Sequence, residues 1–448
     1  MLSSTSQTTA TVQSAAKRPL FAASSGTFIE FFDYGSYSYL ATTIAAVFFP
    51  PGNPTVALVQ TFALFALSFA MRPIGALFWG HFGDRIGRKR ALALTIIGIG
   101  LATTCIGLLP GYATIGFWAP VLLVLLRFLQ SFCTAGEYTG AAILVVEYAP
   151  ADKRARYISS VAIGCAVGFL AASVVSTLLN GLLDEDAMNT WGWRIPFLLA
   201  APMTLVGVYL RNRIDETPVF RAAQEKGELA KLPLVVLFRE HWRALLRTLA
   251  IMGVNATGYY LVLGYMQTYL EVEVGLSGFE ASIIMTTSLL VYLPMLYGGA
   301  YLSDRFGRKT MLMANAVLFL VLSYPIFLLL GISGFAAAMA IQILFVGIFS
   351  LNDSTIACFF TESFPAKVRY SGSAIPTNVG VAIFGGTGPL VASWLIAQTG
   401  DNTMPAFVMM FVALIGAVAL IFTKETKPTK AEAAALNAAT AEAEAKVH

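Results

Sequence analysis

The chain has 448 residues with a net charge of +4, and 57% of its residues are hydrophobic while only 12% are charged. Soluble proteins carry about 25% charged residues, so this composition excludes an ordinary soluble domain. Several apolar runs exceed the ~20 residues that a helix needs to cross a bilayer, and none shows the alternating pattern of a transmembrane barrel. The sequence therefore predicts a polytopic helical protein whose surroundings are the lipid bilayer.

Residues 1–19 precede the first apolar run and are rich in Ser, Thr and Gln. No small-residue cleavage site follows a short apolar core, so this segment is not expected to be a signal peptide. Its polar composition predicts a disordered cytoplasmic arm. The four cysteines all lie in apolar spans, where we expect packing residues and neither a disulfide framework nor a metal site.

Twelve membrane spans are predicted, separated by short connections that often contain Pro or Gly. They are expected at about 20–49, 55–80, 91–109, 116–148, 158–182, 192–211, 243–270, 278–300, 310–330, 334–363, 370–398 and 403–423. A polar cytoplasmic linker, 212–242, divides them into an N-terminal half (20–211) and a C-terminal half (243–423), and a cytoplasmic tail follows over 424–448. The predicted fold class is all-α, with twelve transmembrane helices in two pseudo-symmetric six-helix halves.

The charged residues of the connections alternate in sign along the chain. Lys and Arg collect in every second connection, whereas the others contain no Lys or Arg but hold acids such as Asp184, Glu273 and Asp401. By the positive-inside rule, the basic connections face the cytoplasm. Both termini are therefore predicted to be cytoplasmic, with the chain in the cell inner membrane. Because the positive charge belongs to these loops, no nucleic-acid partner is expected.

The two halves repeat each other at two places. "DRIGRK" at Asp84–Lys89 follows the second span, and "DRFGRK" at Asp304–Lys309 follows the eighth. The fourth span ends in "EYAPADKR" from Glu147 and the tenth in "ESFPAKVR" from Glu362, each with Pro three residues and Arg seven residues later. These matched pairs predict an internal duplication. Repeat-built bundles of this kind usually hold a substrate where the repeats meet and work by alternating access.

At these motifs the sequence resembles a known family. "GHFGDRIGRKR" and "AYLSDRFGRKT" resemble the loop signature of the major facilitator superfamily, although Ala300 stands where the second copy should have Gly. "IEFFDYGSYSYL", "MRPIGALFWG", "RFLQSFCTAGEYTGA", "WGWRIPF" and "ETP" resemble the metabolite:proton symporter family within it. The resemblance covers about residues 26–423.

The resemblance implies a symporter that is driven by the proton gradient and needs no cofactor. Members of that family take up osmolytes such as proline and glycine betaine, or organic acids such as 2-oxoglutarate, citrate and shikimate. "GEYTGA" and "YAPADKR" are more similar to the proline and betaine branch. The osmosensing members of that branch carry a long C-terminal coiled coil, whereas the short tail here lacks apolar heptads. This departure argues against osmosensing but not against transport.

Six ionisable side chains lie well inside the predicted spans, where each is costly unless it is paired or hydrated. They are the acids Glu30, Asp33, Glu137 and Asp353 and the bases Arg72 and Arg127. Four acids cannot all be neutralised by two bases, so at least one carboxylate is expected to take up a proton. A proton-coupled carrier needs that property, and all four acids are candidates for proton coupling.

The first span carries Glu30, Asp33, Tyr34 and Tyr37 within one third of the helix circumference, at roughly 100° per residue. Such a stripe is expected to face the interior of the bundle and to couple proton and substrate, with Asp33 favoured as the titrating acid. The alternative is that the two acids are structural and paired with a neighbouring Arg.

The fourth span carries a second polar stripe. Arg127 is expected to hold a substrate carboxylate through its planar fork, unless it only neutralises Asp33 or Glu30. Glu137 lies roughly 80° away from this stripe and either relays protons or hydrogen-bonds another helix. The remaining members of the stripe are Gln130, Ser131, Thr134 and Tyr138.

Other polar residues in the spans have weaker signals. Arg72 lies nearer the cytoplasmic end, where a long side chain can snorkel to the surface, so a structural role is favoured. Asn255 and Tyr259 in the seventh span and Asn352 in the tenth are candidate substrate contacts, and aromatic rings there would suit a cationic substrate. Aromatic residues in spans are more often packing residues. The eleventh span is broken by Pro and Gly, which is typical of a gating helix.

The resemblance also implies a role for the repeated loops. Ion pairs among them would brace the state that is open to the outside, with topology through positive charge alone as the alternative. The candidate gating residues are Asp84, Arg85, Arg88, Glu147, Arg154, Asp304, Arg305 and Arg308.

The leading hypothesis is a monomeric proton symporter that imports a small osmolyte such as proline or glycine betaine, with an organic-acid symporter as the alternative. A membrane sensor without transport is disfavoured, because it would not need both loop motifs. An enzyme is not expected, since none of the three histidines (His81, His241 and His448) lies deep in a span and no catalytic spacing occurs.

Overall fold

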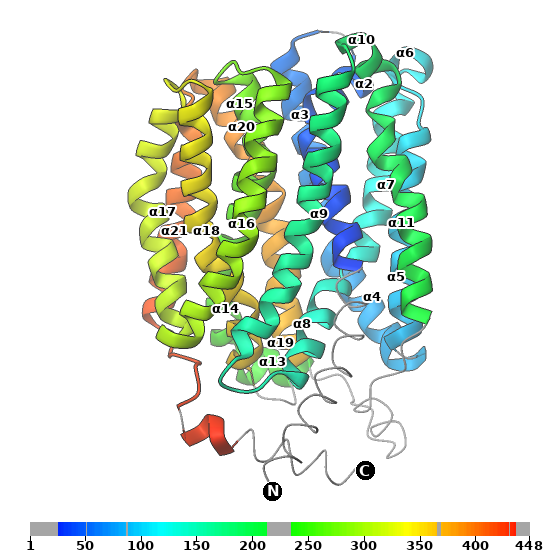
Figure 1. Cartoon of the computed structure of the whole chain (residues 1–448). Helices are drawn as coiled ribbons and strands as arrows, with labels where there is room; N and C mark the ends of the chain where they lie inside the picture. The colour runs from blue at the N-terminus through cyan, green and yellow to red at the C-terminus, as the bar shows by residue number, and fades with distance from the viewer. Residues whose placement is uncertain are drawn as a thin grey trace, which may run out of the picture.

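The computed structural model describes residues 26–50, 52–86, 88–212, 234–364, 369–429 and 431–435. Within these ranges the chain forms helices joined by short connections and contains no strand (Figure 1). The side chains of residues 80–92, 143–144, 146–148, 210–212, 234–236 and 369–370 are not described. The predicted arm (1–19), most of the linker and most of the tail lie outside the described residues, so the domain boundaries stay predictions.

The N-terminal half begins with a helix over residues 26–39. It continues with α2 (Ala41–Phe48), α3 (Pro54–Phe69), α4 (Met71–Ile86), α5 (Arg88–Leu108), α6 (Tyr112–Ile115), α7 (Trp118–Thr134), α8 (Glu137–Tyr148), α9 (Arg154–Leu182), α10 (Glu185–Ala187), the π-helix η1 (Met188–Gly192) and α11 (Arg194–Asn212). Local sequence explains where α3 starts, because the Asn53 side chain caps the backbone N–H of Thr55 and Pro54 occupies the first turn.

The C-terminal half follows the linker. It consists of α13 (Leu234–Glu240), α14 (Trp242–Gly258), the π-helix η2 (Tyr259–Tyr265), α15 (Met266–Val272), α16 (Gly278–Phe306), α17 (Arg308–Leu330), α18 (Phe335–Ser363), α19 (Arg369–Gly380), the π-helix η3 (Val381–Gly385), α20 (Thr387–Thr399) and α21 (Met404–Ile421). The start of α16 is set by a capping box between Ser277 and Glu280.

The predicted spans correspond to these helices. Ten helices or continuous helical runs among the described residues are long and apolar enough to cross a membrane. The two other predicted spans are α5, whose apolar part is Ala93–Leu108, and residues 26–48, which are interrupted by a turn at Leu40. Large apolar side chains such as Leu182 (80% exposed) and Leu205 (73% exposed) point outward, while charged side chains are buried inside. An apolar exterior around buried charged side chains is the reverse of the pattern in soluble proteins and confirms the predicted all-α membrane fold.

The halves pack against each other along several helix pairs. The principal pairs are α9 with α16, α3 with α20, α4 and α8 with α19, and α18 with α8 and α9 (Figure 1). Gly386, between η3 and α20, allows one of these contacts, because a Cβ there would lie 2.7 Å from the Cα of Ala66 on α3. Only glycine permits the two backbones to approach so closely.

The two ends of the bundle differ in charge. The acidic end, where α10 and α15 lie at the top of Figure 1, carries Asp184, Glu273 and Asp401. The opposite end, here called the basic end, contains α13 and the start of α9 and carries Arg154 and Arg156. This separation follows the sign alternation of the connections in the sequence.

Candidate functional site

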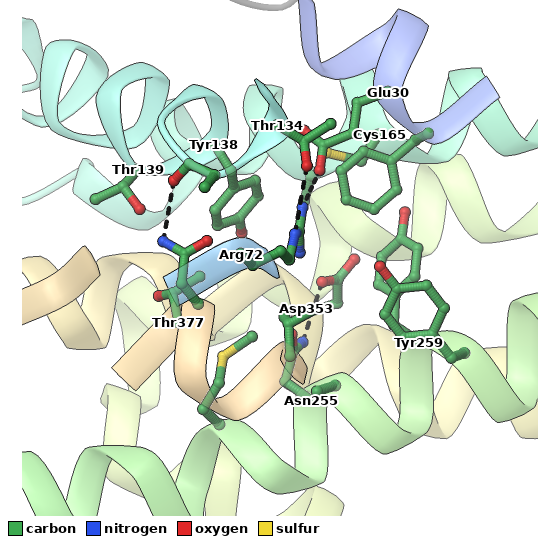
Figure 2. Close-up of a pocket in the computed structure, with 18 residues that line it drawn as sticks. Glu30, Arg72, Thr134, Tyr138, Thr139, Cys165, Asn255, Tyr259, Asp353 and Thr377 are labelled. Atoms are coloured by element: carbon green, nitrogen blue, oxygen red, sulfur yellow. Dashed lines mark hydrogen bonds and ion pairs between the residues drawn. The ribbon is translucent and has the colours of Figure 1, made fainter. Parts of the chain in front are cut away.

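A small cavity of about 40 Å³ lies between the two halves. Both halves contribute to its wall (Figure 2). The lining residues are Glu30, Phe31, Arg72, Thr134, Ala135, Tyr138, Thr139, Ala162 and Cys165 from the N-terminal half, and Met252, Asn255, Ala256, Tyr259, Tyr260, Asp353, Thr377, Asn378 and Val381 from the C-terminal half.

Arg72 and Glu30 form an ion pair on the N-terminal wall of this cavity. The Arg72 Nε also donates to Thr134 Oγ1 at 3.4 Å, and its guanidinium lies 5.6 Å from the ring centre of Tyr34. Glu30 is only 1% exposed, and its Oε2 has no hydrogen-bond partner among the described residues. The pair is therefore held in place but not fully satisfied, so a ligand can still be bound there.

Asp353 occupies the C-terminal wall and differs from Glu30 in its partners. Its Oδ1 accepts a hydrogen bond from Asn255 Nδ2 at 3.2 Å, and its Oδ2 accepts one from the Tyr292 hydroxyl at 2.8 Å. Asn255 Nδ2 also donates to Asn352 Oδ1 at 3.0 Å. Within the part of the chain that the structure describes, Asp353 makes no ion pair. A buried carboxylate with neutral donors alone is poorly compensated.

Aromatic rings complete the wall. Phe31 and Tyr259 make an edge contact with their ring centres 5.0 Å apart, and Tyr260 lies 6.0 Å from Tyr259. Both tyrosines lie at the start of η2, where the helix widens to a π-turn, a feature common at functional sites. The Tyr259 hydroxyl and Thr139 Oγ1 have no partner among the described residues, although both residues are buried. Together with Glu30 Oε2, three buried polar groups of the cavity lining therefore have hydrogen-bonding capacity left for a ligand or water.

A second ion pair lies outside the cavity lining. Arg127 Nη1 is 2.7 Å from Asp33 Oδ2, and Gln130 Nε2 donates to Asp33 Oδ1 at 2.9 Å. The Arg127 guanidinium lies over the ring of Tyr37 at 3.9 Å from its centre. These residues join the helix over 26–39 to α7. The two acids of the predicted stripe in the first span therefore differ in position. Glu30 lines the cavity, whereas Asp33 does not.

The other predicted site residues fall in different places. Tyr138, Asn255, Tyr259 and Asp353 line the cavity together with Glu30. Asn352 lies behind Asp353, and Tyr34 lies beside Arg72 with its hydroxyl 3.2 Å from Thr134 Oγ1. Glu137 accepts a hydrogen bond from Thr95 Oγ1 at 3.0 Å, which connects α8 with α5.

The sequence does not predict several residues of the cavity lining as site residues. The position of Arg72 near the predicted cytoplasmic end of its span favours a structural role, yet Arg72 lines the cavity. Its signal in the sequence is that it is one of two bases inside the spans. Asn378 in the broken eleventh span donates to the Ala135 carbonyl at 3.0 Å across the halves. Tyr260 belongs to the aromatic residues of the seventh span that would suit a cationic substrate, whereas Thr139 has no distinguishing signal, because hydroxyl residues are common in spans.

Ion pairs join the halves at the basic end. Asp304 on α16 accepts the backbone N–H groups of Ala155 at 3.1 Å and Arg156 at 3.2 Å, and it pairs with Arg156 Nε at 3.0 Å. Arg154 lies 3.9 Å from Glu362 on α18. Asp304 thereby caps the N-terminus of α9 from the other half.

The remaining gating candidates divide into two groups. Arg308 pairs within its own half with Asp304 at 2.9 Å and with Glu362 at 3.2 Å, whereas Arg305 is exposed. The side chains of Asp84, Arg85, Arg88 and Glu147 lie outside those that the structure describes.

Neutral hydrogen bonds join the halves at the acidic end. Gln267 Nε2 donates to the Tyr39 carbonyl at 3.1 Å, and Asn180 Nδ2 donates to Ser282 Oγ at 3.0 Å. Ser173 Oγ lies 2.7 Å from Thr286 Oγ1. The cavity therefore lies between two sets of contacts, which include ion pairs at the basic end and hydrogen bonds at the acidic end.

The tail adds a contact at the basic end. Glu425 accepts the backbone N–H groups of Arg308 at 2.8 Å and Lys309 at 3.1 Å, at the start of α17. Gly307 has φ of 104° and carries no side chain that would obstruct this carboxylate. Thr426 Oγ1 donates to Glu362 at 3.0 Å, so the tail reaches the same acid that pairs with Arg154.

The chain matches the profile of the Major Facilitator Superfamily over residues 23–269 and 248–445. It is 35% identical to the proline/betaine transporter of Salmonella typhimurium over 419 residues, which cover 92% of this chain and 84% of that protein. It is 37% identical over 431 residues to the glycine betaine/proline/ectoine/pipecolic acid transporter OusA of Dickeya dadantii, covering 92% of this chain and 85% of the relative. Among solved structures, the partially occluded inward open xylose transporter XylE from E. coli superposes with a TM-score of 0.74 at 17% identity, covering 93% of this chain and 100% of the other.

Proposed function

The chain belongs to the major facilitator superfamily, and we propose that it is a proton symporter that imports a small zwitterionic osmolyte, such as proline or glycine betaine. The observation that carries this proposal is the cavity between the halves, with the Arg72–Glu30 pair on one wall and Asp353 on the other. Relatives named as proline, betaine and ectoine transporters support the choice of substrate class.

The coupling follows from competition for one guanidinium. While Glu30 is ionised, it holds Arg72 and opposes the binding of a second carboxylate. When Glu30 takes up a proton, Arg72 loses its counter-ion and can hold the carboxylate of the substrate through its planar fork. Proton and substrate then bind together, and loss of the proton re-forms the pair and releases the substrate. Asp33 and Arg127 form a similar ion pair, but neither residue lines the cavity, and Gln130 and Tyr37 contact them instead.

Alternating access uses the two sets of contacts between the halves. The basic end is assigned to the cytoplasm by the positive-inside rule, so the ion pairs of Asp304 and Glu362 close the inward path. The neutral contacts of Gln267 and Asn180 close the outward path. In this proposal the carrier acts in the cytoplasmic membrane as a monomer and draws on the proton gradient without a cofactor.

The test is uptake into proteoliposomes with an imposed pH gradient. Proline, betaine and ectoine are compared with 2-oxoglutarate, citrate and shikimate, the substrates of the alternative organic-acid symporter. We expect accumulation of the zwitterions only when the outside is acidic. Glu30→Gln should abolish this accumulation while substrate exchange persists, and Asp33→Asn should lower it less. The proposal would be contradicted if zwitterions accumulated independently of the pH gradient, or if only organic acids accumulated.

A further inference from the structure

The two carboxylates on the cavity have different charge environments. Glu30 already has the Arg72 guanidinium as counter-ion, whereas the donors to Asp353 among the described residues are the amide of Asn255 and the hydroxyl of Tyr292. Asp353 is 3% exposed, and in the described part of the chain it forms no ion pair. Asp353 is therefore a buried acid that has no positive partner among the described residues.

The neutral donors orient Asp353 without saturating it. Each carboxylate oxygen has two acceptor positions, and each is given one hydrogen bond, from Asn255 or from Tyr292. Asn255 is itself held by Asn352, whose Nδ2 donates to Asn315 Oδ1 at 3.2 Å. The network fixes the side chain at the cavity wall and leaves acceptor capacity for a ligand (Figure 2).

Aromatic rings lie on the same cavity as this carboxylate. Phe31, Tyr259 and Tyr260 form a connected group, with ring centres 5.0 Å and 6.0 Å from Tyr259. A carboxylate together with aromatic faces attracts an ammonium group, including one that carries no N–H and cannot donate hydrogen bonds. The opposite wall holds the guanidinium of Arg72. Once Glu30 takes up a proton, the cavity thus has a positive side at Arg72 and a negative side at Asp353, which matches a molecule with both charges.

We propose that Asp353 is the counter-ion for the cationic end of the substrate and is the residue that selects zwitterions over organic anions. The inference rests on the proposed function, since it takes Arg72 as the partner of the substrate carboxylate. It gives Asp353 a different role from the proton coupling that its position in the sequence suggested. A dicarboxylate would bring its second charge next to Asp353, where a low dielectric makes the repulsion strong.

The test compares ligands of the same shape with and without the positive charge. Betaine is paired with 3,3-dimethylbutanoate, in which a carbon atom replaces the quaternary nitrogen, and proline is paired with cyclopentanecarboxylate. Affinities are measured on purified protein by competition with radiolabelled proline and by calorimetry, at one pH and without a gradient. The wild type should bind each zwitterion more tightly than its uncharged-end isostere, by about 10-fold or more.

Asp353→Asn should reduce this preference by about 10-fold or more. Tighter binding of the isosteres than in the wild type would also demonstrate that the variant is folded. Asp401→Asn is the control, because it removes a carboxylate at the exposed acidic end, away from the cavity, and should keep the preference. An unchanged preference in Asp353→Asn would overturn the inference, whether or not proton-driven uptake is lost.

The two proposals fail in different measurements. A wild type that binds zwitterions selectively but does not accumulate them under a pH gradient would contradict the proposed symport and leave the role of Asp353 supported. A wild type that binds neither proline nor betaine would overturn both.

Discussion

The guanidinium of Arg72 pairs with the carboxylate of Glu30 on the wall of the central cavity. Arg127 makes an equivalent pair with Asp33 at 2.7 Å, but it lies outside the cavity lining and against the ring of Tyr37. The two deep arginines therefore have the same chemistry and different access to a ligand, which makes their variants separable.

Arg72→Lys should weaken the binding of proline or betaine by about 10- to 100-fold, because a lysine keeps the charge but loses the planar two-pronged contact with a carboxylate. Arg127→Lys should mainly lower thermal stability, since it disturbs a buried pair. Equilibrium binding and thermal unfolding of both variants check this. If instead Arg127→Lys weakens binding and Arg72→Lys does not, the substrate carboxylate belongs to Arg127.

Asp304→Asn should weaken the contacts between the two halves at the basic end. The change removes a charge that caps α9 from the other half and pairs with Arg156, whose side chain is 26% exposed and therefore partly screened. We expect maximal transport velocity to fall several-fold with little change in substrate affinity. The measurement is initial uptake rate against substrate concentration. The control is Asp401→Asn at the exposed acidic end, and equal effects of the two variants would argue against a gating role for Asp304.

Glu425→Ala should destabilise the start of α17. Loss of a capping carboxylate costs about 0.5–2 kcal/mol, and here the cap also ties the tail to Glu362 through its neighbour Thr426. Thermal unfolding should begin at a lower temperature, and labelling of a cysteine introduced at the basic end should become faster. Glu432→Ala offers a control, because among the described residues the Glu432 carboxylate accepts hydrogen bonds only from Thr429, within the tail. If Glu432→Ala lowered the unfolding temperature and Glu425→Ala did not, the prediction would be contradicted.

Gly386→Ala should separate α20 from α3. A Cβ there would lie 2.4 Å from a ring carbon of Phe69 and 2.7 Å from the Cα of Ala66, whereas a Cβ at Gly298 would meet nothing within 4 Å. Overpacking of this kind costs about 1–3 kcal/mol. The temperature of thermal unfolding and the uptake rate should both fall for Gly386→Ala. Both should stay near the wild-type values for Gly298→Ala. Matching behaviour of the two variants would mean that the helices can move apart freely.

The loops at the basic end show which contacts a short sequence motif can predict and which it cannot. The second repeated motif predicts a charged turn after the eighth span, and Asp304 and Arg308 do form an ion pair there at 2.9 Å. The same motif does not predict that Glu425, more than a hundred residues later, caps the helix that follows. That contact depends on where α21 ends relative to α17, which no short pattern specifies.

The sequence by itself determined the number and length of the apolar spans, the division into two halves and the separation of basic from acidic ends. These properties depend on runs of about 20 neighbouring residues and on their transfer from water to lipid. Only the tertiary structure decided which acid meets which base. Glu30 and Asp33 are three residues apart, so their side chains point roughly 60° away from each other, and each direction leads to a different helix. Glu30 consequently meets Arg72 at the cavity and Asp33 meets Arg127 behind it, because a buried charge takes the partner that packing brings within reach.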